Sequence, residues 1–130
     1  MILFLIPALF TSDVELLEGF LPVPVGQNAQ TPHEKTFDEE ISYLSEKYTV
    51  NAELALKIIG CESQFQAHAT GSPVIGEDIG YFQINTYFHQ TTAENMGLNL
   101  FNWRDNLEYG FWLLSTSGTA PFLWSQDCWQ

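Results

Sequence analysis

Apolar residues recur every three or four positions in two stretches that follow residue 35, and this spacing predicts amphipathic helices. The first helix is expected to begin at Thr36, because Thr36 and Glu39 form a capping-box pattern. Its apolar face consists of Phe37, Ile41, Leu44 and Tyr48. The second helix is expected to run from about Ala52 to Glu62, behind Asn51, which is a favourable N-cap residue.

Two more helices are predicted closer to the C-terminus. A short one is expected to start at the capping pattern of Thr91 and Glu94 and to end at Gly97. A longer one is expected to start at Asp105, with an inward face made of Leu107, Phe111 and Leu114. Residues 66–85 are rich in glycine and contain a proline, which predicts a small β-hairpin or an extended lip. The whole pattern indicates a mainly α fold of the α+β class.

Residues 1–35 differ in character from the rest, and we expect them to precede a domain formed by residues 36–130. Met1 is followed by nine apolar residues, a run too short to span a bilayer. The run is similar to the apolar region of a signal peptide, but no basic region precedes it, because the first cation is Lys35. It is therefore either what remains of a longer export signal or a docking strand. Prolines interrupt the segment that follows, which we expect to be a flexible spacer.

Composition narrows the classes of partner. At 130 residues the chain has room for one ordinary domain. Its formal net charge of −12 argues against nucleic acid and against strong binding to anionic membranes. Four Trp, five Tyr and ten Phe form a heavy aromatic load, which suits either a core or stacking on sugar rings. The tryptophans are expected in the core: Trp103, Trp112, Trp124 and Trp129.

The chain has two cysteines, Cys61 and Cys128. An even number in a protein with an export-like N-terminus predicts one disulfide, which would tie the C-terminal tail back onto the domain. A catalytic Cys61 assisted by His68 or His89 is an alternative, but its flanking residues match no thiol-protease signature. A metal site built from His33, His68 and His89 lacks the usual ligand spacing, so we expect neither a metal nor a cofactor.

Two carboxylates occupy unlike local settings, and this is the strongest chemical signal in the chain. Leu54, Ile58 and Glu62 are spaced i, i+4 and i+8, so Glu62 lies on the apolar face of its helix and in the last turn. Burial and the negative end of the helix dipole should both raise the pKa of Glu62. Asp78 falls in the glycine-rich segment instead. Cleavage of a glycosidic bond needs one protonated and one ionised carboxyl, and this pair fits that requirement.

These carboxylates belong to a pattern with a family resemblance. The pattern reads Glu62-Ser63-x-Phe65, followed by Asp78 and then Gly80-x-Phe82-Gln83-Ile84-Asn85. It resembles the lysozyme-like superfamily, which includes soluble lytic transglycosylase domains and animal lysozymes. The resemblance covers roughly Phe37 to the C-terminus, and by it Glu62 matches the catalytic acid and Asp78 the second carboxylate. Lysozyme is also the standard example of this division of roles between two carboxyls.

The resemblance also assigns substrate-binding residues. Gln83 and Asn85 match positions that line the sugar cleft, and the neighbouring Tyr81, Tyr87 and Phe88 are further cleft candidates. A weaker match, Asn106-Leu107-x-x-Gly110-x-Trp112-Leu113, resembles the packing helix of transglycosylase domains. Two features depart from the family patterns. Animal lysozymes carry several disulfides, and residues 117–121 replace the Asn-Ala-Gly-x-Gly segment of many lytic transglycosylases.

The resemblance implies a lysozyme-like fold with several helices around a cleft, and an enzyme that cleaves peptidoglycan. The bond would be the β-1,4 link between N-acetylmuramic acid and N-acetylglucosamine. The binding partner would be the peptidoglycan glycan strand, and the protein would be a monomer. Such an enzyme would act outside the cytoplasm, as a secreted, periplasmic or cell-envelope protein. Glu62 would act alone in a 1,6-anhydro-forming lytic transglycosylase, or with Asp78 in a hydrolase. Two alternatives remain: a catalytically inactive member that binds wall glycans or a partner protein, and an inhibitor or structural secreted domain.

Overall fold

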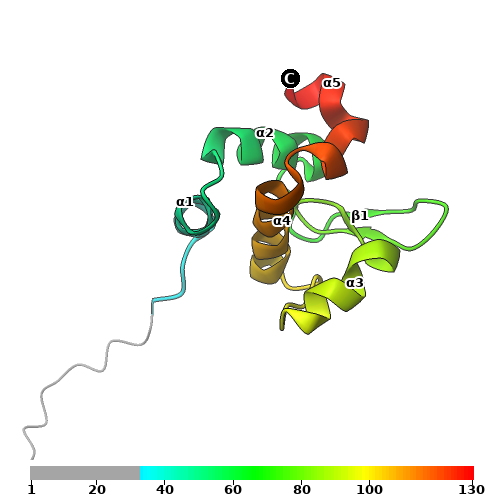
Figure 1. Cartoon of the computed structure of the whole chain (residues 1–130), viewed down its shortest axis with the longest axis horizontal. Helices are drawn as coiled ribbons and strands as arrows, with labels where there is room; N and C mark the ends of the chain where they lie inside the picture. The colour runs from blue at the N-terminus through cyan, green and yellow to red at the C-terminus, as the bar shows by residue number, and fades with distance from the viewer. Residues whose placement is uncertain (1–32) are drawn as a thin grey trace, which may run out of the picture. The chain divides into compact units, whose positions relative to one another are not determined.

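A computed structural model describes residues 33–130, so the apolar N-terminal run and the spacer lie outside the described residues. Residues Glu34–Gln130 form one unit in which helices predominate (Figure 1). The elements are α1 (Phe37–Tyr48), α2 (Ala52–Ser63), β1 (Thr70–Gly71), β2 (Asp78–Ile79), β3 (Ile84–Asn85), α3 (Thr86–Asn95), α4 (Trp103–Ser117), the 3-10 helix η1 (Ala120–Ser125) and α5 (Gln126–Trp129). Together with the small antiparallel sheet, this architecture agrees with the predicted mainly α, α+β class.

The first two helices begin where the sequence predicts. Thr36 is the N-cap of α1 and forms both halves of the capping box with Glu39. The Asn51 side chain caps α2 by accepting a 2.9 Å hydrogen bond from the backbone N–H of Leu54. Each cap satisfies a backbone donor that the helix itself leaves without a partner. Both predicted starts are confirmed.

The next two helices begin earlier than predicted. The N-cap of α3 is Asn85, whose side chain accepts the Tyr87 N–H, so Thr91 lies inside the helix rather than at its start. The N-cap of α4 is Asn102, whose side chain accepts hydrogen bonds from the two residues that follow Trp103. The predicted starts at Thr91 and Asp105 are therefore wrong. Asparagine caps at least as well as the threonine and aspartate that suggested those starts.

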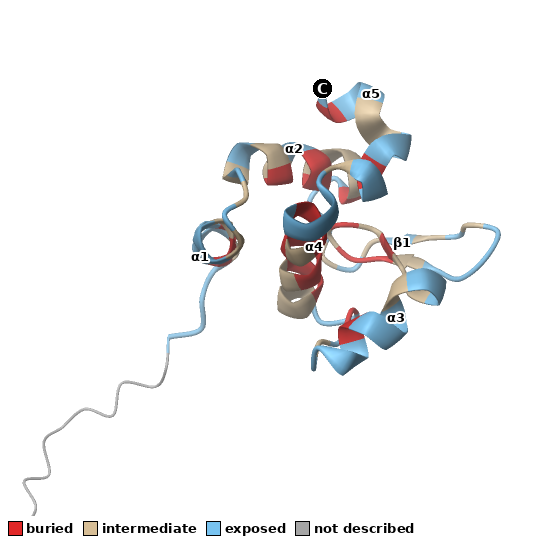
Figure 2. Cartoon of the chain, viewed as in Figure 1, coloured by how far each residue is buried: buried red, intermediate tan, exposed pale blue. Residues whose placement is uncertain are grey.

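The core gathers around α4, against which α1 and η1 pack. Buried positions run along α4 and along one side of α2 (Figure 2). The predicted inward residues of α4 are all buried: Leu107, Phe111 and Leu114. Trp129 is buried as well, and Trp103 and Trp112 pack against the core. Trp124 is the exception, because its side chain is fully exposed at 102% of the reference area, so its prediction as a core residue is wrong.

A three-stranded antiparallel sheet in the order β1-β2-β3 is formed within residues 70–85, where a hairpin or lip was expected. The loop between β2 and β3 is fixed against α4 by the buried Asn106 amide. Asn106 donates to the carbonyls of Ile79 and Leu100 and accepts the Phe82 N–H. Gly80 has φ +75°, and a Cβ there would lie 2.4 Å from the Asn106 side chain. The backbone can therefore come this close to α4 only with glycine at position 80.

The predicted disulfide between Cys61 and Cys128 is present, with Cα atoms 5.9 Å apart. It joins the last turn of α2 to α5 across a sequence separation of 67 residues. The sulfur of Cys61 is thus bonded and is not available as a nucleophile in this form of the protein. Among residues 33–130, no helix combines the length and the apolar character that a bilayer span requires.

Candidate active site

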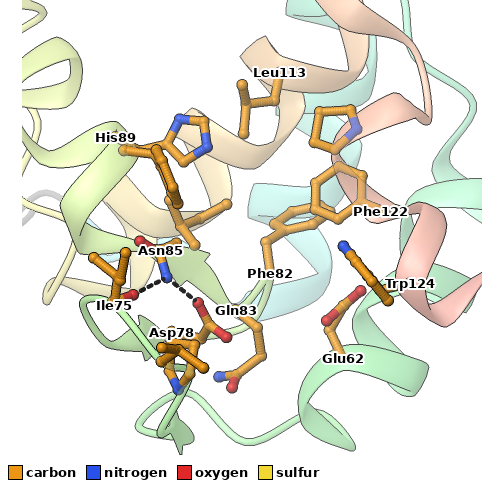
Figure 3. A pocket seen from close by; sticks show the side chains of 15 residues that line it. Glu62, Ile75, Asp78, Phe82, Gln83, Asn85, His89, Leu113, Phe122 and Trp124 are labelled. Atoms are coloured by element: carbon orange, nitrogen blue, oxygen red, sulfur yellow. Dashed lines mark hydrogen bonds between the residues drawn. The ribbon is translucent and has the colours of Figure 1, made fainter.

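A cleft of about 580 Å³ lies between the end of α2, the sheet, α3, α4 and η1. Figure 3 shows Glu62 beside Trp124 on one side of this cleft, with Asp78, Asn85 and His89 across from them. A volume of this size is typical of small-molecule and cofactor sites. The cleft brings together both carboxylates that the sequence singled out.

Glu62 lies in the last turn of α2, which ends immediately after it because Gln64 adopts a left-handed conformation with φ 53°. Its side chain is half-buried in the wall of the cleft. Burial raises the pKa of the Glu62 carboxyl above its ordinary value. The Ser125 hydroxyl opposes this rise by donating a 2.6 Å hydrogen bond to Oε1, and the negative charge of Asp78 adds to it. A carboxyl with a raised pKa suits a general acid.

Asp78 is held by its partner on the neighbouring strand. Asp78 and Asn85 pair directly in the register of β2 and β3, and the Asn85 amide donates to Oδ1 of Asp78 at 2.9 Å. The same amide nitrogen donates to the carbonyl of Ile75 at 3.0 Å (Figure 3). Since the Asn85 oxygen also caps α3, this side chain fixes the sheet, the loop and the helix at one point. Asn85 therefore lines the cleft mainly as a scaffold for Asp78.

Gln83 also lines the cleft, and its amide is anchored to the backbone. Its Nε2 donates to the carbonyls of Ala69 at 3.1 Å and Gly80 at 2.9 Å, which uses both amide hydrogens. Gln83 itself adopts the left-handed region with φ 48°, which is uncommon for a residue with a side chain. A ligand that reaches Gln83 would meet its amide oxygen rather than its donors.

The two tyrosines predicted to bind substrate lie away from the cleft lining. Tyr81 packs in an aromatic cluster, with ring centroids 4.9 Å from Phe37 and 6.3 Å from Trp103. Tyr87 is 67% exposed and contacts the ring of Phe88 edge-on at 5.0 Å. The cleft is lined by Phe88 and not by either tyrosine.

Exposed apolar side chains surround the cleft, and of these the sequence had suggested only Phe88. Val74 and Trp124 are fully exposed, and Phe88 is 66% exposed, yet all three line the cleft. Large apolar groups left in water around a cavity mark a ligand or partner site. Trp124 lies within the short 3-10 helix η1, which has a proline in its first turn, so no amphipathic pattern indicated which way its side chain would face.

His89 and Ser125 are two further polar residues at the site that the sequence did not assign. His89 lines the cleft, and its Nδ1 lies 3.1 Å from the hydroxyl oxygen of Tyr109. Burial lowers the pKa of His89, which favours the neutral form of the ring. Ser125 reaches Glu62 from the other end of the domain. Neither contact leaves a trace in local spacing, because each joins residues far apart in the sequence.

The lysine and arginine side chains form ion pairs with glutamates and do not line the cleft. Each lysine or arginine pairs with a glutamate: Lys35 with Glu40, Lys47 with Glu108, Lys57 with Glu53, and Arg104 with Glu34. Among the described residues that line the cleft, none is a lysine or an arginine. The cleft therefore offers carboxylates, amides and apolar surfaces to a ligand.

Comparison of the chain with protein-family models, with curated proteins and with solved structures found no match. The family resemblance consequently rests on the sequence motifs themselves.

Proposed function

We propose that the protein is a peptidoglycan-cleaving enzyme with a lysozyme-like fold and with Glu62 as its general acid. The bond cleaved would be the β-1,4 link between N-acetylmuramic acid and N-acetylglucosamine. One observation carries the proposal: two carboxyls in unlike surroundings line one cleft. The pKa of Glu62 is raised, chiefly by burial, while Asp78 is held by the amide of Asn85.

The chemistry follows from this difference. Protonated Glu62 delivers its proton to the glycosidic oxygen as the bond between that oxygen and the anomeric carbon breaks, which leaves oxocarbenium-like charge on the sugar. In the route that we favour, the 6-hydroxyl of the muramic acid adds to the anomeric carbon, and its proton passes to the ionised Glu62. In hydrolysis, Asp78 would stabilise or attack the anomeric carbon, and water would complete the reaction. The likeness of residues 106–113 to the transglycosylase packing helix favours the first route.

The cleft surfaces support a glycan as substrate. Trp124 and Phe88 present aromatic rings at its edges, and such rings can cover the apolar faces of sugars. The identity of the sugars comes from the motif resemblance. We further propose that the protein acts as a monomer outside the cytoplasm, where oxidising conditions would maintain the disulfide between Cys61 and Cys128.

A second candidate is a catalytically inactive module that binds wall glycans. The exposed apolar side chains at the cleft favour it, because they would bind a glycan whether or not Glu62 transfers a proton. Purified, oxidised protein incubated with isolated peptidoglycan separates the two. A fall in turbidity with release of soluble muropeptides supports the enzyme. Co-sedimentation with intact peptidoglycan and no release supports the binding module. If the protein neither releases muropeptides nor co-sediments with peptidoglycan, both proposals are contradicted.

A further inference from the structure

The carboxyl of Glu62 receives a hydrogen bond from a residue that lies near the C-terminus. The Ser125 hydroxyl donates to Oε1 of Glu62 at 2.6 Å, and both side chains are partly buried. The same hydroxyl lies 3.1 Å from the carbonyl oxygen of Phe122. A serine hydroxyl has one proton to donate, and the shorter contact leads to the carboxyl oxygen.

Trp129 restricts how the Ser125 hydroxyl can turn. The indole Nε1–H lies 3.1 Å from the Ser125 oxygen and 3.2 Å from the carbonyl oxygen of Phe122, and it donates to both. Trp129 is only 7% exposed, so its ring is a fixed part of the core. Because the serine oxygen accepts from the indole, its own proton is directed away from Trp129 and toward Glu62.

A covalent bond holds this arrangement together. Cys61 directly precedes Glu62, and Cys128 lies between Ser125 and Trp129 in the sequence. The disulfide between the two cysteines therefore anchors the segment that carries the donor to the helix turn that carries the acid. The chain from Ser125 to Trp129 is short, so this anchor leaves the hydroxyl little freedom relative to the carboxyl.

We propose that Ser125 is a positioning residue that fixes the Glu62 carboxyl with Oε1 as hydrogen-bond acceptor and Oε2 as the oxygen that carries the transferable proton. In a neutral carboxyl, the oxygen without the proton is the better acceptor, so the serine bond selects Oε2 for protonation. The proton thereby acquires one defined position instead of two. The catalytic consequence rests on the proposed function, whereas the contact with Glu62 does not.

The pH dependence of kcat distinguishes a positioning role of Ser125 from a merely structural one. A hydroxyl that donates to the carboxylate stabilises the ionised form, and the Ser125 bond does lower the pKa of Glu62 against the effect of burial. Loss of Ser125 should raise that pKa further. A general acid works only while protonated, so activity falls as the pH rises through the pKa of Glu62. The alkaline limb of the kcat profile should therefore move to higher pH in Ser125→Ala.

The test compares four variants of the full chain with intact disulfide. Ser125→Ala removes the donor, Ser125→Thr retains a hydroxyl, and Trp129→Phe retains a ring but not the indole N–H. Ser115→Ala is the matched control, because Ser115 is exposed and donates to the carbonyl of Trp112 away from the cleft. We expect Ser125→Ala to lower kcat by about tenfold to a hundredfold, as misplacement of a reacting group does. Its alkaline limb should shift upward, and Trp129→Phe should show a smaller shift of the same sign.

Ser125→Thr should restore kcat and the position of the alkaline limb toward wild type, and Ser115→Ala should leave both quantities unchanged. The second readout is the pKa of Glu62 itself, followed by carbon-13 NMR of its carboxyl, which needs no activity. A higher Glu62 pKa in Ser125→Ala supports the contact even if the wild-type protein proves inactive and the proposed function fails. An unchanged pKa or an unchanged alkaline limb in a folded Ser125→Ala overturns the proposal. If Ser125→Ala does not fold, Trp129→Phe decides by the same two measurements.

Discussion

Asp78 and Asn85 form a cross-strand pair in which the asparagine amide donates a 2.9 Å hydrogen bond to Oδ1 of the aspartate. Asn85 is at the same time the N-cap of α3 through its oxygen. One side chain thus sets the position of the second carboxylate and the start of a helix. The negative charge of Asp78 then acts across the cleft to raise the pKa of Glu62.

Replacement of the acid tests the proposed chemistry most directly. Glu62→Gln retains the volume of the side chain and an oxygen that can accept from Ser125, but it cannot donate the catalytic proton. Loss of a general acid costs at least about a hundredfold in rate, so muropeptide release should fall by that factor. Glu53→Gln is the matched control, because Glu53 lies on the same helix and is exposed. Activity of Glu62→Gln within tenfold of wild type would exclude Glu62 as the acid.

The same substitution should have the opposite effect on stability. The pKa of Glu62 is raised above 4.5 in the folded protein, chiefly by burial, so folding binds its proton more tightly. The contribution of Glu62 to the free energy of unfolding is therefore most favourable below the ordinary carboxyl pKa and is lost as the pH rises through the raised pKa of Glu62. We expect Glu62→Gln to melt at a higher temperature than wild type at pH 7, with a smaller difference at pH 4. Thermal unfolding at both pH values measures this, and a lower melting temperature at pH 7 contradicts it.

Asp78→Asn distinguishes the two ways of completing the reaction. In the favoured transglycosylase route, Glu62 acts alone, so the variant should retain activity within about tenfold and the products should carry 1,6-anhydro ends. Because the charge of Asp78 raises the pKa of Glu62, the alkaline limb should move to lower pH. Mass spectrometry of the muropeptides identifies the ends. Reducing ends together with a severe loss of activity would assign the enzyme to the hydrolases instead.

Trp124 is expected to bind the glycan rather than to support the fold. Its side chain is fully exposed at the cleft, so Trp124→Ala removes little buried area and should leave the melting temperature unchanged. Loss of a stacking surface worth about 0.5–1.5 kcal/mol should raise KM by about twofold to thirteenfold. Leu123→Ala is the control, since Leu123 is 52% exposed but does not line the cleft. Equal effects of the two variants would contradict a specific role for Trp124.

Reduction of the disulfide should destabilise the domain and loosen the site. The bond closes a sequence separation of 67 residues, which is worth about 4 kcal/mol in the chain-entropy model. The melting temperature should drop by about 15–30 °C under reducing conditions. Alkylation and mass spectrometry of protein exported by its native route provide the check. Two free thiols in that material would show that the bond does not form where the protein works.

Several features could be predicted because they depend on neighbours in sequence. The caps at Thr36 and Asn51 act over three residues, and the inward face of α4 follows from helical spacing. The start of α3 could not be read in this way, since the Thr91 pattern imitates a cap while Asn85 forms the actual one. The disulfide was predictable because the chain has only two cysteines.

The parts of the site that escaped prediction depend on how the C-terminal segment returns to α2. Ser125 meets Glu62 across 63 residues, and Trp124 is exposed only because η1 turns its side chain outward beside the cleft. A tryptophan in an aromatic tail is more often buried than exposed, which is why Trp124 was expected in the core. Tyr81 was a substrate candidate by its position in the motif, yet its ring lies against Phe37 and Trp103.

The close approach of the motif loop to α4 has an evolutionary consequence. A Cβ at Gly110 would lie 2.0 Å from the ring of Phe82, and one at Gly80 would lie 2.4 Å from Asn106. Neither glycine can acquire a side chain unless its neighbour shrinks or the loop withdraws, which would displace Asp78. We therefore expect these positions to change as linked pairs among descendants of this chain. A lineage that loses both pairs together would be one in which selection on the cleft has been relaxed.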